Sequence, residues 1–157
     1  MDFGGRYLLA APRAQVWAAL NDTEVLKTTV PGCRRLDWTG PNTLEMELQV
    51  NLGIIKPVFT GDLMLSGISP AERYTLAGKG RGGLLGLAEG SADISLSDAG
   101  GGTELLFTAH GGASGKIMNL GKALIGNSAQ KVIDGFFERF AAAMGTQVTV
   151  LQPPVEF

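Results

Sequence analysis

The sequence contains little of what most metal and catalytic sites need. Its 157 residues include one cysteine, Cys33, and one histidine, His110. One cysteine cannot form a disulfide within the chain, and together with one histidine it cannot complete a zinc site. Most nucleophile–base pairs use an imidazole, so a single histidine also limits nucleophilic catalysis. We therefore expect neither a metal nor a covalent cofactor, and we expect binding in preference to catalysis.

Charge is sparse and nearly balanced. The chain has 13 Lys and Arg against 15 Asp and Glu, which gives a net charge of -2. Without a basic excess, the release of counterions cannot drive binding to a polyphosphate, so we expect no nucleic-acid partner. No apolar run approaches the ~18 residues that a membrane span needs. The first residues lack the basic start and apolar stretch of a signal peptide, and we expect a cytoplasmic protein.

Apolar side chains and glycine are abundant instead. Hydrophobic residues make up 45% of the chain, and its 23 glycines are about twice the usual share. The length suits one domain with a hydrophobic core, since domains usually have roughly 100–200 residues. We place this domain over residues 1–145 and predict a short, mobile tail over residues 146–157.

Hydrophobic periodicity predicts the secondary structure. Apolar residues alternate with polar ones after residue 33, as in Leu44, Met46 and Leu48 against Glu45 and Glu47, which is typical of half-buried antiparallel strands. Before that point the spacing is helical. The predicted elements are a strand over 3–10, short helices over 13–20 and 23–29, and strands over 44–52, 59–65, 73–79, 88–97 and 103–110. Glycine-rich turns between them favour a meander of six or seven strands.

One long helix is predicted over residues 115–144, with Lys131, Asp134 and Glu138 on its polar face. At 1.5 Å per residue it would extend roughly 40–45 Å. The order of elements is that of the α+β helix-grip fold, in which a curved antiparallel sheet wraps a long C-terminal helix. The space between sheet and helix predicts an apolar cavity, the usual form of a small-molecule site.

The residues expected to line this cavity lie on the inward faces of the predicted elements. They are Trp17, Leu20, Val30, Met46, Leu48, Val50, Phe59, Leu63, Leu65, Leu105, Phe107, Met118, Gly121, Ile125, Ala129, Val132, Phe136 and Phe140. A second apolar set flanks basic residues or lies on the all-round apolar first half of the long helix. We expect it to frame the cavity mouth and to contact a membrane or a partner: Leu84, Leu85, Leu87, Ile117, Leu120 and Leu124.

The remaining motifs favour structural roles. Residues 78–83 match G-x-G-x-x-G, but a dinucleotide site needs a helix directly afterwards, and a strand pattern follows here. We interpret these glycines as allowing the sheet to bend or bulge. Cys33 is expected to be a small buried hydrophobe, His110 a hydrogen-bonded residue at a strand end, and Glu45 and Glu47 solvent-facing. We therefore expect none of these residues to form a set of catalytic side chains.

Over residues 1–145 the sequence resembles the CoxG family of carbon monoxide dehydrogenase subunits, in the START/polyketide-cyclase-like (SRPBCC) superfamily. The resemblance depends on motifs from both ends of the domain. They are Phe3-x-Gly5-x-Tyr7, Asp22-x-x-Val25-Leu26, Pro31-Gly32-Cys33, Gly78-Lys79-Gly80, Gly115-Lys116-x-x-x-Leu120-Gly121 and Phe136-Phe137-x-x-Phe140.

The resemblance implies the helix-grip fold and a non-catalytic accessory role. Such a protein would recruit a carbon monoxide dehydrogenase-type molybdenum hydroxylase to the inner face of the cytoplasmic membrane, by peripheral contact, and link it to the quinone pool. Combined with the predicted cavity, it implies a non-covalently bound quinone of the menaquinone type. Two alternatives stay open: a cyclase or dehydratase-like enzyme using the same cavity, and a protein-only adaptor whose interior is filled by side chains.

Overall fold

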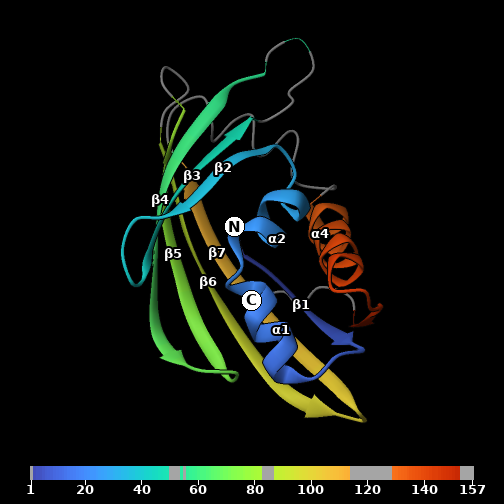
Figure 1. The fold of residues 1–157 in the computed structure, drawn as a ribbon. Coiled ribbons are helices and arrows are strands. Elements are labelled where there is room, and N and C mark those ends of the chain that lie inside the picture. The colour runs from blue at the N-terminus through green and yellow to red at the C-terminus, as the bar shows by residue number, and fades with distance from the viewer. Residues whose placement is uncertain (1, 50–53, 55, 83–86, 114–128, 153–157) are drawn as a thin grey trace.

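The computed structural model describes residues 2–49, 54, 56–82, 87–113 and 129–152. In that part of the chain, one strongly curved sheet holds the helices on its concave side (Figure 1). The elements are β1 (Asp2–Leu9), α1 (Arg13–Leu20), α2 (Thr23–Thr29), β2 (Cys33–Trp38), β3 (Thr43–Gln49), β4 (Val58–Ser69), β5 (Arg73–Arg81), β6 (Leu87–Ala99), β7 (Gly102–Ala113), α4 (Ala129–Ala143) and β8 (Val148–Gln152). This α+β helix-grip architecture confirms the predicted fold class.

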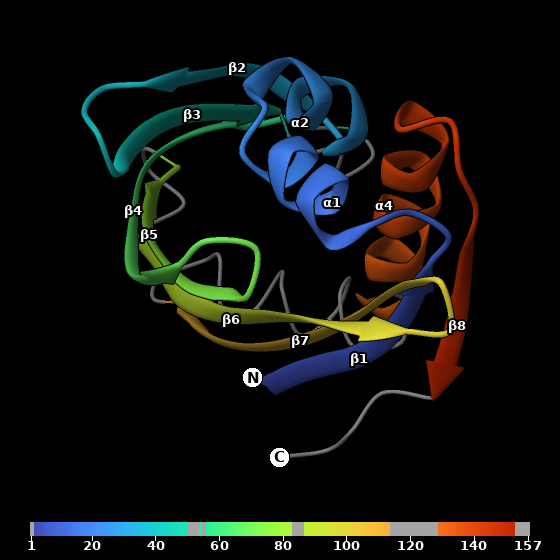
Figure 2. The same cartoon turned by 60° about the horizontal axis from the view of Figure 1, so that its bottom comes forward.

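The sheet is antiparallel throughout. Its strands lie in the order β2-β3-β4-β5-β6-β7-β1-β8, and seen from below they curl around the helices (Figure 2). It has eight strands, where six or seven were expected. The spacing of apolar residues changes from helical to alternating at residue 33, and β2 begins at this residue. The other strand beyond the predicted set is β8.

Local sequence explains both short helices, whose bounds match the prediction. Pro12 precedes α1, where its missing N–H leaves no hydrogen bond unmade. Asp22 caps α2, because its carboxylate accepts a hydrogen bond of 3.0 Å from the Glu24 amide. α2 ends at Thr29 because Val30, which precedes Pro31, is extended. The two helices close one end of the curved sheet (Figure 2).

The tail differs from the prediction of a mobile segment over residues 146–157. Val148–Gln152 forms β8, which pairs with β1. The approach to this strand is bonded too: the Ala10 amide donates to the Gln147 carbonyl at 3.0 Å, and the Thr146 hydroxyl donates to the Ala10 carbonyl. Without β8, one edge of β1 would present unpaired backbone groups, and this pairing satisfies them. Residues 153–157 lie outside the described residues.

α4 (Ala129–Ala143) corresponds to the C-terminal half of the long helix predicted over residues 115–144. Residues 115–128 lie outside the described residues. Among the described side chains of α4, those of residues 133–143, Phe137, Phe140 and Ala141 are the most buried. Asp134 departs from the prediction, because it does not simply face solvent. Its carboxylate accepts a hydrogen bond of 2.8 Å from the hydroxyl of Tyr7 on β1. The buried face of α4 therefore includes Phe137 and Ala141 besides the predicted Phe140. The hydrogen bond from Tyr7 to Asp134 joins this helix to the sheet.

A tightly packed region lies where β1, β7, α1 and α4 meet. Tyr7, Leu9, Val16, Leu105 and Phe140 are all fully buried there. The ring of Tyr7 stacks on Phe137 with centroids 4.1 Å apart. We call the five fully buried residues the packed region. It anchors the C-terminal helix against the sheet and leaves the space beneath β2–β6 less completely filled.

Candidate ligand cavity

A cavity of about 340 Å³ lies between the inner face of the sheet and the helices. Its wall comes from β2 to β7, the end of α1, α2 with the segment that follows it, and α4. The lining residues are Leu20, Asn21, Leu26, Val30, Pro31, Leu36, Trp38, Leu44, Met46, Leu63, Leu65, Tyr74, Leu76, Ala92, Ile94, Phe107, Ile133, Phe136 and Phe137. The wall is almost entirely apolar, and the volume is within the range of small-molecule sites, near its lower end.

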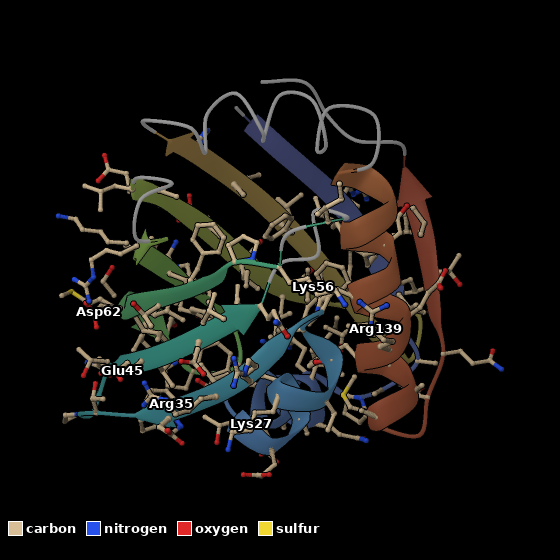
Figure 3. The ribbon with its side chains drawn as sticks, turned by 90° about the horizontal axis from the view of Figure 1, so that it is seen from above. Lys27, Arg35, Glu45, Lys56, Asp62 and Arg139 are labelled. Atoms are coloured by element: carbon tan, nitrogen blue, oxygen red, sulfur yellow. The ribbon has the colours of Figure 1, made fainter. Side chains whose placement is uncertain are left out.

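Strand alternation produces this wall. On β3, Leu44 and Met46 face the cavity. Their neighbours point the other way and form ion pairs with β2: Glu45 with Arg35, and Glu47 with Arg34 at 3.7 Å. Figure 3 shows Arg35 and Glu45 together on the outside of these strands. The alternation therefore separates an apolar inner face from a charged outer face, as the sequence predicts.

Glycines on β5 and directly after it create room on the same inner face. A Cβ at Gly78 would lie 2.7 Å from Leu63 Cδ2, and one at Gly82 would lie 2.2 Å from Phe59 Cε1. Side chains of β4 therefore occupy the space that β5 leaves open. The prediction was that these glycines let the sheet bend or bulge. The pairing of β5 with β4 is regular from Thr60 to Ser66 and shifts register only between Ser66 and Ser69, so this part of the sheet curves without a bulge at the glycines (Figure 1).

The structure brings part of the predicted lining together. Among the predicted residues, those that line the cavity are Leu20, Val30, Met46, Leu63, Leu65, Phe107 and Phe136. Those outside the described residues are Val50, Met118, Gly121 and Ile125, and the side chains of Ala129 and Val132 are not described either. Whether the lining binds a ligand stays a prediction.

Five predicted lining residues are not in the wall. Leu105 and Phe140 belong to the packed region, because β1 and α4 close over them. Trp17 instead packs edge-to-face against Tyr74. Phe59 lies over Gly82, and Leu48 stands beside it in the β3–β4 ladder. Inward orientation alone therefore does not separate wall from core.

Sequence reasoning missed several lining residues, and some carried a usable signal. Leu44 belongs to the same alternating run as Met46, and Tyr74 and Leu76 alternate along β5. Leu36 and Trp38 alternate likewise along β2. Asn21, Pro31 and Ile133 carried no such signal, because only the packing of α1, α2 and α4 against the sheet brings them to the wall.

The predicted mouth is largely beyond what the structure describes. Leu84, Leu85, Ile117, Leu120 and Leu124 lie outside the described residues. Leu87, the first residue of β6, is 57% exposed. The position of an entrance at these residues therefore stays a prediction.

Polar chemistry in the wall is limited to a few groups. The side-chain nitrogens and oxygens among the lining residues are those of Asn21, Trp38 and Tyr74. Burial raises the pKa of the Tyr74 hydroxyl above its ordinary value, so the group stays protonated near neutral pH. Among the described lining residues, none is a carboxylate, a histidine or a lysine. This described part of the wall offers neutral hydrogen bonds and no acid–base pair.

The two residues most often used in catalysis lie away from this wall. His110 is inside β7, not at its end, and stands opposite Ser91 of β6 on the exposed side of the sheet. Cys33 is half-buried, and burial raises its pKa, which keeps the thiol protonated. Over the described part of the chain, no cluster of histidine, cysteine and carboxylates suits a metal ion.

None of the described helices is long and apolar enough to cross a membrane.

The curved antiparallel sheet, the helices on its concave side and the apolar cavity between them define a helix-grip protein. The family comparison makes this more specific. The CoxG family model, which describes a carbon monoxide dehydrogenase subunit, matches residues 5–145, and the chain belongs to that family. This confirms the resemblance seen in the sequence motifs. No curated protein matches the sequence significantly.

Solved structures share the fold at low sequence identity. A conserved protein from Geobacillus kaustophilus is 23% identical, with a TM-score of 0.83, over 94% of this chain and 99% of that one. A protein from Rhizobium leguminosarum is 16% identical, with a TM-score of 0.71, over 92% and 94%. The Zhui aromatase/cyclase from a Streptomyces species is 13% identical, with a TM-score of 0.64, over 92% and 93%. At these identities the likeness shows the fold alone.

Proposed function

We propose that this protein is a non-catalytic accessory protein that holds the headgroup of a respiratory quinone, of the menaquinone type, in its cavity. In this proposal it recruits a carbon monoxide dehydrogenase-type molybdenum hydroxylase to the inner face of the cytoplasmic membrane and passes electrons from that enzyme to the quinone pool. The family, named for carbon monoxide dehydrogenase, supports the choice of enzyme. The observation that carries the proposal is the apolar wall of the cavity between sheet and helices.

The size of the cavity limits what it holds. At about 30 Å³ for each water-sized group, a cavity of about 340 Å³ accommodates about eleven such groups. This is the scale of a fused two-ring headgroup or a short acyl chain. A long isoprenoid tail exceeds it, so the tail would extend out of the described cavity. Each CH₂ removed from water contributes about 0.8 kcal/mol before ordering costs.

An enzymatic role is the second candidate, favoured by the shared fold of the Zhui aromatase/cyclase. Cyclisation and dehydration need a proton donor and acceptor beside the substrate. Within the described part of the chain, the lining residues contain one phenol, one amide and one indole but no carboxylate or imidazole. The wall therefore supports binding over acid–base chemistry. The volume of the cavity likewise supports a ligand carrier over an adaptor with a filled interior.

The test is to identify what the purified protein carries. Protein expressed in an organism with a quinone pool is extracted with organic solvent, and the extract is analysed by mass spectrometry. We expect a co-purifying quinone in the wild type. Ala92, on the cavity wall, and Ala77, on the exposed side of the neighbouring strand, provide a matched pair of sites. Ala92→Phe should carry at least fivefold less quinone, whereas Ala77→Phe should carry as much as the wild type.

Two outcomes would contradict ligand carriage: extracts without any lipophilic compound, or equal loading of both alanine variants when circular dichroism shows that both are folded. Recruitment is tested separately. The hydroxylase should sediment with quinone-containing phospholipid vesicles when this protein is added, and should stay in the supernatant without it. Sedimentation that does not depend on the protein would remove recruitment from the proposal and leave binding intact.

A further inference from the structure

One wall residue carries a hydrogen-bond donor with no partner among the described residues. Tyr74 on β5 is only 6% exposed and lines the cavity. None of the described residues accepts a hydrogen bond from its hydroxyl. In that same part of the chain, no fully enclosed side-chain nitrogen or oxygen lacks a partner. The Tyr74 hydroxyl must therefore border open space, and a buried donor left unsatisfied is costly.

The other tyrosine provides the internal comparison. Tyr7 is fully buried, and its hydroxyl donates to the Asp134 carboxylate at 2.8 Å. Tyr7 does not line the cavity, and Tyr74 does. The sequence contains only these two tyrosines. The first joins sheet and helix, while the second lines an apolar cavity and its hydroxyl has no partner among the described residues.

The environment of Tyr74 holds its ring in place. Trp17 packs against it edge-to-face, with ring centroids 5.4 Å apart and an angle of 83°. The backbone carbonyl of Trp17 accepts a hydrogen bond of 2.9 Å from Asn21 Nδ2, which places the Asn21 amide at the same end of α1. Asn21 also lines the cavity. The polar side chains of Tyr74 and Asn21 thus both lie near α1, in a wall whose other described polar side chain is the indole of Trp38.

We propose that the Tyr74 hydroxyl donates a hydrogen bond to a carbonyl-type oxygen of the ligand, whose polar end lies beside α1. This inference rests on the proposed function and specifies the ligand class: an uncharged, mostly hydrocarbon molecule with an acceptor oxygen at one end. A carboxylate is a poor match, because the lining residues that the structure describes include no cation and a buried unpaired charge is costly. A pure hydrocarbon would leave the hydroxyl without a partner.

Two probes of similar shape separate the hydrogen bond from apolar burial. They are 2-methyl-1,4-naphthoquinone, which has two carbonyl oxygens, and 2-methylnaphthalene, which has none. Their Kd values are measured by equilibrium dialysis on delipidated wild-type protein and on Tyr74→Phe. We expect the substitution to raise the Kd of the naphthoquinone roughly two- to tenfold, the range for one neutral hydrogen bond. The Kd of 2-methylnaphthalene should stay the same or fall.

A thermal melt distinguishes a ligand contact from a structural one. Tyr74→Phe removes an unpartnered hydroxyl, so the Tm of the ligand-free protein should not fall. The matched control, Tyr7→Phe, removes a hydroxyl that Asp134 accepts from, so it should lower Tm without changing the ratio of the two Kd values.

Equal effects of Tyr74→Phe on both probes, or none on either, would overturn the inference and leave the proposed function standing. If the wild type binds neither probe, both the inference and the proposed function fail.

Discussion

The packed region and the cavity wall share one hydrophobic interior but differ in how completely they are filled. Tyr7, Leu9, Val16, Leu105 and Phe140 are fully buried and come from β1, β7, α1 and α4. None of them lines the cavity. The wall comes mainly from β2 to β6, and several of its residues, such as Met46 and Leu63, are only partly buried. Packing is therefore concentrated on one side of the helices and open space on the other.

This difference in packing between the two regions explains how the fold combines stability with a cavity. β1 lies near the edge of the sheet, between β7 and β8, and α4 packs on it through Phe137 and the Tyr7–Asp134 hydrogen bond. That contact holds the helix on the sheet. β3 to β5 curve away from the helices (Figure 2), so the wall can border unfilled space without the fold depending on it. Less stable regions are where binding sites usually lie.

The difference in packing is tested most directly by replacing one leucine with alanine in each region and comparing the losses of stability. Leu105→Ala removes a fully buried side chain from dense packing, and we expect a loss of about 3–5 kcal/mol in the free energy of unfolding. Leu76→Ala, on the cavity wall, should cost about 1–2 kcal/mol, because Leu76 already lacks contact atoms on one side. Urea denaturation of both variants measures the difference. Equal losses would mean that the two regions are packed alike.

The hydrogen bond between sheet and helix should have an intermediate effect. Tyr7→Phe keeps the stacked ring but removes the donor to Asp134, and we expect a loss of about 1–3 kcal/mol. Urea denaturation measures it, with Tyr74→Phe as the matched control. Unchanged stability in Tyr7→Phe would show that Asp134 does not help to hold α4 on the sheet.

The smallest expected effect concerns the thiol of Cys33, which packs against the interior. Burial raises its pKa above 9.0, so less thiolate is present at pH 8 than in an unstructured peptide. Alkylation by iodoacetamide at pH 8 should therefore be several-fold slower than in urea-unfolded protein, and its rate should rise with pH beyond 9. Mass spectrometry follows the modification. Equal rates in folded and unfolded protein would contradict a shielded thiol.

Periodicity and capping predicted most of the fold, because these signals are local. Asp22 as an N-cap and the residue pair Val30-Pro31 define α2 from sequence alone. Alternation along β3 identified which residues face inward. It did not predict β8, since the pairing of Val148–Gln152 depends on the free edge of β1, which is more than 130 residues away in the sequence.

The candidate site was predicted less well for the same reason. Met46 and Phe107 were assigned to the cavity from strand alternation and do line it. Leu105 has the same inward orientation as Phe107 but lies in the packed region, because Tyr7 of β1 is its neighbour in the sheet. Tyr74 was not singled out, since nothing local distinguishes a satisfied tyrosine from one whose hydroxyl meets a cavity.

Local sequence signals were enough to predict the class of fold, the short helices, the inner and outer faces of the strands, and the family. Those properties follow from spacing, capping and motifs within short stretches of chain. The packing of distant segments was needed to show where the interior is dense, where it is hollow, and which of the two tyrosines lines the cavity. These features depend on how far α4 and α2 stand from a curved sheet, a distance set by contacts between residues remote in sequence.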